Sequence, residues 1–407
     1  MRHSARTACG DEFTHKPQTD AVQGFFINMT SEDRKTARAE RRRAARTANE
    51  KQRIEPYNDF SLVADADNLA RAFAKSKRGV SWKESVQRYE ANALRNIAQT
   101  RRKLLSGESV QSGFVEFDLK ERGKTRHIRS VHISERVVQK CLCDKVLAPL
   151  LSRPLIHDNG ASIAGKGVHF ALRRLVAHLS RFYRSNGRSN EGHALLVDFS
   201  IFFDNIRHDA LFAMQERYLT EPRLRALTRG FISAFGDDKS LGLGSQVSQI
   251  CAIFYPNALD HCIKEKLRVK YYGRYMDDLC LIHADKAFLE KCLAEIKTVC
   301  ARFDIVVNEK KTRIVRLSSG VPFLKGKYAL LPSGKILRRP GKESAKRMRR
   351  KLKAFKKLAD AGKMDCADVY ASYQSWRGGY AQRFNAHFAV KRMDALYDGL
   401  FINTHPQ

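Results

Sequence analysis

Long apolar runs and paired cysteines are both missing from this sequence of 407 residues. No stretch approaches the roughly 18 consecutive apolar residues that a membrane-spanning helix needs, so we expect no membrane span. The nine cysteines are odd in number, scattered and never spaced C-x-x-C, which argues against a secreted, disulfide-stapled protein. Several lie in apolar runs, as buried free thiols do. We therefore expect a cytoplasmic protein with reduced cysteines.

Acidic residues are few relative to basic ones. The chain has 75 Lys and Arg residues against 43 Asp and Glu residues, a formal net charge of +32. A surface this basic repels itself unless it meets a polyanion, and nucleic acid is the commonest polyanion for such a protein. The length is ample for a sizeable core and predicts two or three subdomains.

The N-terminal region is polar and then strongly basic. Residues 1–28 lack the basic-then-apolar pattern of a signal peptide, whereas Met29 precedes TSED at 30–33, which predicts a helix start. We hypothesise that Met29 is the natural start, which mass spectrometry of the native N-terminal peptide would test. Residues 34–53 form either a solvated helix or disordered tail, or an arm that folds along a phosphate backbone. The candidate phosphate contacts in this arm are Arg41, Arg42 and Arg43.

Hydrophobic periodicity predicts an α+β fold without internal repeats. Residues 60–106 have a helical pattern, and segments 114–119 and 126–129 around a charged turn predict a basic β-hairpin. Further helices are expected at 134–150, 168–183, 208–218, 222–236, 247–267, 286–303 and from about 342 onward. Further strands are expected at 194–199, 271–274, 279–283, 304–307, 312–317 and 321–330.

Three acidic residues stand out by their surroundings. Asp198 ends an apolar strand, and Asp277 and Asp278 lie in the turn between two apolar strands. Desolvated carboxylates brought together repel one another unless a cation lies among them, and Mg²⁺ suits such oxygen ligands. An Asp-Asp pair alone is weak evidence, because acids in turns are usually solvated.

The context of these acids resembles reverse transcriptases, with six motifs in the family's order. YGRYMDDL at 272–279 resembles the YxDD signature, and VDFSIFFDNIRH at 197–208 is similar to the first acidic motif of bacterial members. LGSQVSQ at 243–249 resembles the turn and helix that cradle the incoming nucleotide. The remaining similarities are GKTRHI at 123–128 to the fingers hairpin, and NEKKT at 308–312 and GVPFL at 320–324 to the last palm motifs.

The resemblance implies a right-hand polymerase with fingers, palm and helical thumb. It implies an RNA-directed DNA polymerase that adds dNTPs to a 3′-hydroxyl on an RNA template by two-metal phosphoryl transfer. The expected divisions are an extension and basic arm at 1–59, N-terminal helices and fingers at 60–190, the palm at 191–335 and the thumb at 336–407.

Site roles follow from the resemblance position by position. Asp198 and Asp277 would bind two Mg²⁺ ions, for which Mn²⁺ could substitute, with Asp278 beside them and the Phe199 carbonyl completing one shell. Phe203 would stack under the sugar and exclude a 2′-hydroxyl, which favours dNTPs; the alternative for this ring is an ordinary core position.

Cations and a glycine turn would hold the nucleotide. Lys124 and Arg126 would grip the triphosphate, although generic RNA contact is an alternative. Lys311 would protonate the leaving pyrophosphate or contact the backbone. Leu243 precedes Gly244 where group II intron and retroviral enzymes usually carry Gln, a form closer to diversity-generating retroelement and phage or antiphage-defence enzymes. Reduced fidelity is our hypothesis for this departure, and misincorporation equal to that of a Leu243→Gln variant would count against it.

The C-terminal tail carries a second basic element. Met348, Leu352 and Phe355 recur at helical spacing within 346–357 and should pack on the thumb. The cations left to contact a duplex, or simply to be solvated, are Lys346, Arg347, Arg350, Lys353 and Lys357. Tyr373, Trp376 and Arg377 could stack on bases, and a core role for Trp376 is the alternative.

The expected partners are an RNA template, in particular a dedicated structured RNA, the DNA product and dNTPs. The rival interpretations are an RNA-directed RNA polymerase, against which Phe203 argues, and a non-catalytic RNA-binding protein on a polymerase fold. No zinc-ligand endonuclease cluster follows the thumb, and a full RNase H domain would not fit. Antiphage defence, a mutagenic retroelement and a mobile element all remain open as roles, as do the priming mode and the oligomeric state.

Overall fold

The computed structural model describes residues 30–121, 124–381 and 385–402. The chain divides into two compact units, Met1–Pro56 and Tyr57–Gln407. The polar segment 1–28 and the hypothesis about Met29 lie outside the described residues.

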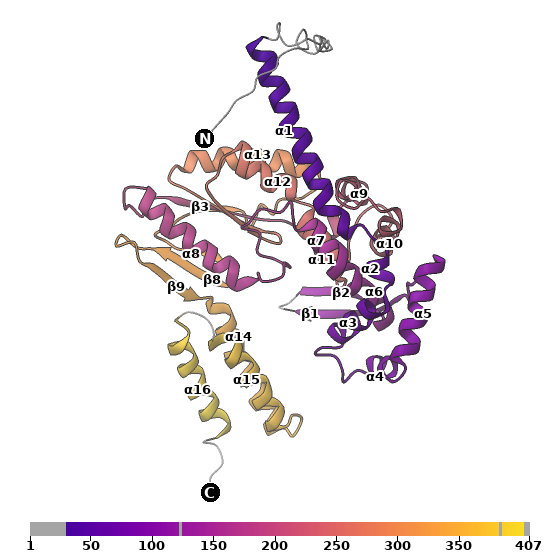
Figure 1. The fold of residues 1–407 in the computed structure, drawn as a ribbon. Coiled ribbons are helices and arrows are strands. Elements are labelled where there is room, and N and C mark those ends of the chain that lie inside the picture. Colours follow the sequence, from indigo (N-terminus) through magenta and orange to yellow (C-terminus); the bar gives the residue numbers. More distant parts are fainter. Residues whose placement is uncertain (1–29, 122–123, 382–384, 403–407) are drawn as a thin grey trace, which may run out of the picture. The chain divides into compact units, whose positions relative to one another are not determined.

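The described part of the first unit is one basic helix, α1 (Ser31–Ile54) (Figure 1). Its N-terminus is a capping box, in which the Thr30 side chain accepts from the Asp33 N–H and the Asp33 carboxylate accepts from the Thr30 N–H. The helix start predicted at residues 30–33 is therefore confirmed. The side chains of Arg41, Arg42 and Arg43 are exposed on this helix.

The second unit begins with short helices around a small apolar core. They are α2 (Ser61–Ala64), α3 (Ala66–Ser76), α4 (Glu84–Ala91) and α5 (Ala93–Ser106), after the single turn η1 (Glu55–Tyr57). Val63 and Leu69 are fully buried, and the Phe73 and Tyr89 rings lie 4.8 Å apart. The helical pattern predicted at 60–106 is confirmed, and it comprises four helices.

A two-stranded antiparallel hairpin follows, as predicted. It joins β1 (Phe114–Glu121) to β2 (Lys124–Val131), with Phe117 opposite Ile128. One helical segment then runs through α6 (Ile133–Leu142), the π-turn η2 (Cys143–Leu147) and α7 (Ala148–Leu151). Gly244 touches the hairpin, because a Cβ there would lie 3.0 Å from the Arg129 carbonyl oxygen.

The central sheet has the strand order β4-β5-β3-β6, with every neighbouring pair antiparallel. Its strands are β3 (His193–Asp198), β4 (Tyr271–Tyr275), β5 (Asp278–His283) and β6 (Arg313–Arg316). Helix α8 (Val168–Ser185) packs Leu175 and Leu179 against Leu196 and Ile282, and α13 (Lys286–Arg302) lies on the other face (Figure 1). The β3 side chains from Ala194 to Asp198 are all buried, so the strand is covered on both faces.

Two expected elements differ from the structure, and one strand was not expected. The strand expected at 321–330 is wrong: β7 (Val321–Phe323) and β8 (Gly326–Leu330) form a hairpin whose two turn residues, Leu324 and Lys325, have positive φ. The segment 304–307 makes only a single bridge, Phe199 with Val307, instead of a strand. A further strand, β9 (Ile336–Pro340), pairs with β8 and was not expected.

The helix expected at 247–267 is broken into three pieces. They are α11 (Gln246–Phe254), α12 (Asn257–His261) and the π-turn η4 (Cys262–Lys266). The break falls at Pro256, which has no N–H to donate to the preceding turn. Helices α9 (His208–Glu216) and α10 (Pro222–Ser233) are formed as predicted.

Three helices form the C-terminal region: α14 (Lys342–Asp360), α15 (Cys366–Ala381) and α16 (His387–Phe401). Met348 and Leu352 are buried and Phe355 packs against them, so the predicted apolar stripe is confirmed. The mixed helical and antiparallel architecture confirms the α+β class. The proposed limits of fingers, palm and thumb stay predictions.

The described cysteines are all free thiols. Six of the eight are buried, Cys262 is partly buried and Cys366 is exposed. This agrees with the expectation of reduced cysteines inside apolar runs, and burial raises the pKa of the Cys141 thiol to about 12. Among the described residues, no helix combines the length and apolar character needed to cross a membrane.

Candidate active site

The three predicted acids meet at adjoining strand ends of the central sheet. Asp198 is the last residue of β3 and lies directly opposite Asp278, the first residue of β5. Asp277 is in the tight turn between β4 and β5, where Met276 has a φ of +56°. We call Asp198, Asp277 and Asp278 the acid cluster.

Electrostatic repulsion in the acid cluster is visible at Asp278. Burial, and then the charges of Asp277 and Asp198, raise the pKa of Asp278 to about 7, although Lys311 opposes the shift. Such a carboxyl group is destabilised in its ionised form unless a cation approaches.

Lys311 is the cation that the structure places on Asp198. Its Nζ lies 2.7 Å from both carboxylate oxygens. Asn308 donates its side-chain amide to the same carboxylate at 3.1 Å and its backbone N–H to the Asp198 carbonyl at 2.8 Å. The sequence predicted Lys311 to act on pyrophosphate or on the backbone, and it missed this contact with Asp198, as it missed Asn308.

The donor chemistry of the acid cluster fits a divalent metal. Carboxylate oxygens are the ligands that Mg²⁺ takes, and Lys311 stands in for a cation at Asp198. Within the described residues, no group of three or more His, Cys, Asp or Glu side chains is already arranged to hold a metal ion. Lys311 contacts both oxygens of Asp198, so a metal there would share the carboxylate with the ammonium or replace it.

The backbone around Phe199 leaves its carbonyl out of the local bridge. The two bonds of that bridge run from Ser200 N–H to the Val306 carbonyl at 2.7 Å and from Asn308 N–H to Asp198. The Phe199 ring is buried against Phe202, with centroids 5.3 Å apart. The metal role predicted for this carbonyl stays a prediction.

A second carboxylate beside the β4–β5 hairpin is fully neutralised. Asp260 and Arg274 have no exposed side-chain area, and the Arg274 Nη2 lies 2.7 Å from Asp260 Oδ2. Tyr272 donates its hydroxyl to Asp260 at 2.6 Å. We call Asp260, Tyr272 and Arg274 the Asp260 network.

The Asp260 network also holds the turn that carries Asp277. Arg274 Nη1 donates to the carbonyl of Met276 at 2.9 Å, and Nη2 donates to the carbonyl of Ile253 at 2.7 Å. Sequence reasoning missed this network. The sequence did contain a signal, because Arg274 is a charged residue in the strand segment YYGRY at 271–275, whose other residues are uncharged.

The turn that carries Gly242 and Gly244, which we call the glycine turn, lies beside the first acidic motif at 197–208. The Leu241 N–H donates to the Phe203 carbonyl at 3.0 Å, which joins the turn to the short helix η3 (Phe203–Asn205). Gly244 has a φ of +120° and Ser245 caps α11 by accepting from the Ser248 N–H. The structure therefore brings Phe203, Leu243 and Gly244 into one region, with Phe203 and Leu243 half-buried.

The structure places the backbones of the two predicted triphosphate contacts but does not describe their side chains. Lys124 and Arg126 have backbones in β2, opposite Glu121 and Leu119, but their side chains lie outside the described residues. Their roles stay predictions.

A cavity of 610 Å³ opens beside the acid cluster. Its walls include Asp277 and Asp278, the side of α8 at His169, and basic residues of the three-stranded sheet β7-β8-β9. Lys325 and Arg339 are two of these basic residues. The cavity thus joins the carboxylates to cations that suit a phosphate backbone.

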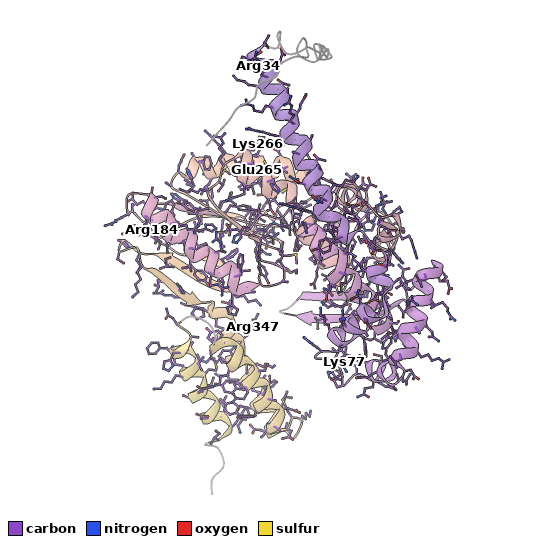
Figure 2. The ribbon with its side chains drawn as sticks, in the orientation of Figure 1. Arg34, Lys77, Arg184, Glu265, Lys266 and Arg347 are labelled. Atoms are coloured by element: carbon purple, nitrogen blue, oxygen red, sulfur yellow. The ribbon has the colours of Figure 1, made fainter. Side chains whose placement is uncertain are left out.

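The basic face of α14 is exposed as predicted. Lys346, Arg347, Arg350 and Lys353 are all exposed on this helix, on which Figure 2 labels Arg347. A cavity of 510 Å³ lies between α14 and α15, with Arg347 and Arg350 in its walls.

The aromatic residues expected near nucleic acid belong mainly to the core of the three C-terminal helices. Tyr373 is buried and stacks on Tyr397 with centroids 4.6 Å apart. Trp376 packs against the same core and donates to Ser344 at 3.1 Å. Arg377 pairs with Asp394 at 2.7 Å. The core alternative for Trp376 is the one that the structure supports.

Solved structures similar to this chain include fungal telomerases. Telomerase from Candida albicans, in complex with a TWJ fragment of telomeric RNA, is 11% identical with a TM-score of 0.45 and covers 74% of this chain and 65% of that one. Apo telomerase from Candida tropicalis is 12% identical with a TM-score of 0.44, and the match covers 74% of this chain and 63% of that one. A form of it truncated from the C-terminal domain is also 12% identical with a TM-score of 0.44, and the match covers 56% of this chain and 55% of that one. The chain thus spans between 55% and 65% of the telomerase chains that it matches.

No protein of curated function matches the chain. The family model for reverse transcriptase (RNA-dependent DNA polymerase) matches residues 119–344, which is more than half of the sequence. That range contains the β1–β2 hairpin from Leu119 onward, the acid cluster and the Asp260 network. The chain therefore belongs to the reverse transcriptase family.

Proposed function

We propose that this protein extends a 3′-hydroxyl on an RNA template with dNTPs by two-metal phosphoryl transfer. The observation that carries the proposal is the acid cluster, in which Asp198 and Asp278 lie opposite each other at adjoining strand ends and Asp277 occupies the turn between β4 and β5. A protein that only bound RNA would have no physical reason to gather three carboxylates in a basic chain.

The acid cluster would hold the metal ions. Asp198 and Asp277 would be the main ligands, the Phe199 carbonyl would complete one shell, and Asp278 would support them. Two Mg²⁺ ions, when bound, supply activation of the 3′-hydroxyl and neutralisation of the leaving pyrophosphate. Asn308 orients Asp198 by its amide, and Lys311 neutralises Asp198 before the substrate arrives.

Nucleotide selection would fall to the region of the glycine turn. Phe203 and Leu243 would lie against the sugar and the base, and Lys124 and Arg126 would bind the triphosphate from the fingers hairpin. Gly244 supports this arrangement because its φ of +120° suits glycine and because a Cβ there would crowd the Arg129 carbonyl oxygen at 3.0 Å, so glycine permits the close approach of the turn to the hairpin.

The polyanionic partners would be the RNA template, especially a dedicated structured RNA, and the DNA product. The exposed cations of α1 and α14 are available to a phosphate backbone, and the net charge of +32 favours such partners. The free, mostly buried thiols suit a cytoplasmic location, which we propose as well. A role in antiphage defence or in a retroelement is the biological setting we propose for the activity.

Primer extension tests the proposal. The full chain is given a primed RNA template, Mg²⁺ and either dNTPs or rNTPs, beside an Asp277→Ala/Asp278→Ala control. We expect dNTP extension that the control abolishes. If no product forms, RNA that co-purifies with the protein is sequenced and offered as the template, and continued failure with that RNA would refute polymerase activity.

The choice between DNA and RNA synthesis has its own test. If Phe203 excludes the 2′-hydroxyl, Phe203→Ala should raise rNTP use relative to dNTP use by about 10- to 200-fold, the range for removing bulk from a discriminating pocket. Phe202→Leu, a change at the buried neighbouring ring, is the matched control. Efficient rNTP extension by the unmodified chain would instead identify an RNA-directed RNA polymerase.

A further inference from the structure

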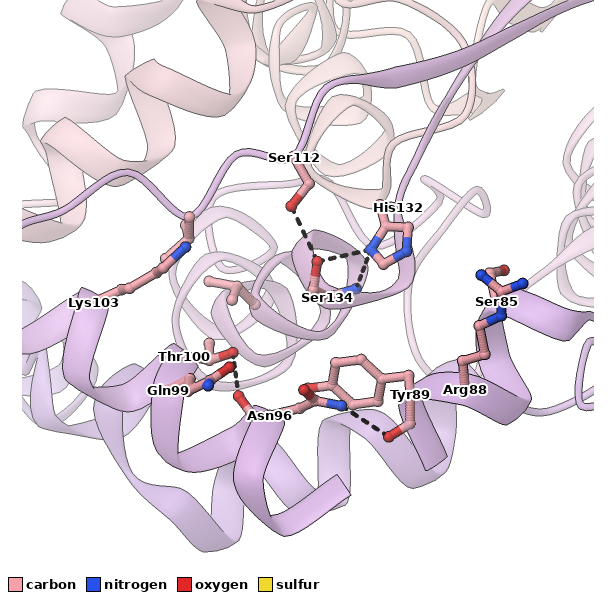
Figure 3. A pocket seen from close by; sticks show the side chains of 12 residues that line it. Ser85, Arg88, Tyr89, Asn96, Gln99, Thr100, Lys103, Ser112, His132 and Ser134 are labelled. Atoms are coloured by element: carbon pink, nitrogen blue, oxygen red, sulfur yellow. Dashed lines mark hydrogen bonds between the residues drawn. The ribbon is translucent and has the colours of Figure 1, made fainter. Parts of the chain in front are cut away.

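A separate cavity of 440 Å³ lies in the N-terminal helices (Figure 3). Helices α4 and α5, the segment before β1 and the start of α6 enclose it. Most of its lining precedes residue 119, where the family match begins, so it is largely outside the shared polymerase core. The lining residues are Ser85, Arg88, Tyr89, Asn96, Gln99, Thr100, Lys103, Val110, Ser112, His132, Ser134 and Val138.

The wall of this cavity is rich in hydroxyl and amide groups. Ser112 and Ser134 share a hydrogen bond of 3.0 Å, and Ser134 also contacts His132 Nδ1 at 2.9 Å (Figure 3). The Tyr89 side chain is buried, and the Thr100 side chain is a polar neighbour of its hydroxyl. A ligand with its own hydroxyls or oxygen acceptors would satisfy such a wall.

Cations stand at two sides of the cavity. Figure 3 shows Arg88 and Lys103 at opposite ends, on α4 and α5 respectively. Arg88 also pairs with Glu84 on its own helix, and its side chain remains 78% exposed. Two cations across a polar cavity suit an extended anionic backbone rather than one small anion.

An exposed tryptophan lies next to the cavity in the chain. Trp82 is three residues before Ser85, and 73% of its surface is exposed. The Nζ of Lys83 lies 5.6 Å from the centroid of its ring. A large aromatic ring left in solvent beside a cation is the arrangement on which single-stranded nucleic acids stack their bases.

We propose that Trp82 and this cavity bind a single-stranded RNA segment outside the polymerase core. A base stacks on Trp82, the phosphates contact Arg88 and Lys103, and the hydroxyl and amide wall receives ribose 2′-hydroxyls. The inference rests on the proposed function in taking RNA as the template, and it adds a second place where an unpaired stretch is held.

Tryptophan fluorescence tests the inference, because the chain has only two tryptophans. Trp376→Phe leaves Trp82 as the only reporter, and an oligouridine of about ten nucleotides is the probe. We expect the emission to be quenched on binding. Arg88→Ala and Lys103→Ala should each raise the Kd several-fold and reduce the salt dependence by about one phosphate contact. Leu94→Ala, a change at a nearby residue that is 85% exposed and outside the lining, should change neither.

A second measurement removes dependence on the Trp376→Phe variant. The unmodified chain and Trp82→Ala are titrated in parallel, and the difference in emission reports Trp82. Absence of quenching in both formats would overturn the inference. Oligodeoxythymidine in place of oligouridine should bind more weakly, and equal affinity would overturn the ribose contacts.

The outcome is separable from that of the proposed function. Asp277→Ala/Asp278→Ala should stop extension yet leave the Trp82 quenching unchanged. Quenching in the unmodified chain, together with no extension on either the defined template or the co-purified RNA, would refute the polymerase and keep the RNA site. Extension without quenching would refute the RNA site alone.

Discussion

The acid cluster and the Asp260 network lie at the same β-hairpin but solve the burial of charge in opposite ways. Asp260 is matched by Arg274, and Tyr272 supplies a further hydrogen bond. In the acid cluster Lys311 pairs with Asp198, while burial and the charges of Asp277 and Asp198 raise the pKa of Asp278 to about 7. The first arrangement satisfies a buried carboxylate within the protein, whereas repulsion between carboxylates persists at Asp278 in the second.

This difference predicts that the Asp260 network contributes mainly to stability and the acid cluster mainly to function. A buried ion pair in good geometry fixes the backbone that it contacts, here the Met276 carbonyl just before Asp277. A group of repelling carboxylates costs stability and is expected only where a ligand supplies the balancing charge. Mutations in the two groups should therefore give opposite combinations of effects.

The largest expected effect is on activity, from Asp277→Asn. The substitution keeps the size of the side chain and removes its charge. Extension should fall on the order of a thousandfold or more, since a main electrostatic stabiliser of the reaction is lost, while the free energy of unfolding changes by less than about 1 kcal/mol. Primer extension and urea unfolding on the same preparation check both halves. A large loss of stability would remove the contrast between the two groups.

The next largest effect is on stability, from Arg274→Met. Removing one partner leaves Asp260 as an uncompensated buried charge, so the free energy of unfolding should drop by about 3–5 kcal/mol. Urea unfolding followed by circular dichroism measures it. Replacing both partners, as Asp260→Leu/Arg274→Met, should recover part of the stability but not extension, because the Met276 carbonyl loses its donor. Full activity in the double variant would show that the network does not position the turn.

A smaller effect is expected from Lys311→Met. If the acid cluster binds Mg²⁺ as proposed, Lys311 would compete with the metal for Asp198, so its removal should lower the Mg²⁺ concentration for half-maximal extension by about two- to fivefold, the range for a partly exposed pair. The variant Lys310→Met, at the exposed neighbouring lysine, is the control. An increased Mg²⁺ requirement would mean that Lys311 helps to assemble the site rather than competing for it.

The smallest expected effect is a change in stability whose sign differs between the acid cluster and the Asp260 network. Asp278→Asn removes a like charge directly opposite Asp198 and should stabilise the fold by up to about 1 kcal/mol. Asp260→Asn leaves Arg274 without its carboxylate partner and should destabilise the fold. Urea midpoints of the two variants give the comparison, and destabilisation by both would show that repulsion in the acid cluster is not a net cost.

Local patterns predicted much of the fold but not its interruptions. Alternation located the hairpin around residues 114–131, and an unbroken apolar run located β3, whose residues from Ala194 to Asp198 are all buried. The turn at Leu324 and Lys325 was missed, since neither residue type signals positive φ. Pro256 did signal the break between α11 and α12, and the apolar run around it hid that signal.

The residues of the candidate site could be predicted where a short local sequence motif identifies them. Asp277 and Asp278 were found from their motif, as was Asp198. The contact of Lys311 with Asp198 joins residues 113 positions apart, which only the assembled sheet brings together. The pairing of Arg274 with Asp260 likewise crosses from a strand to a helix, so a sequence pattern within either element does not reveal it.

The distribution of thiols gives the molecule a ready attachment point for a probe. Cys366, at the first residue of α15, is the exposed cysteine among those described, whereas six others are buried. After Cys9→Ser, a maleimide dye should couple first at Cys366, with Cys262 reacting more slowly because it is partly covered. A reporter on α15 would then follow, in real time, how the C-terminal helices respond when a duplex is added.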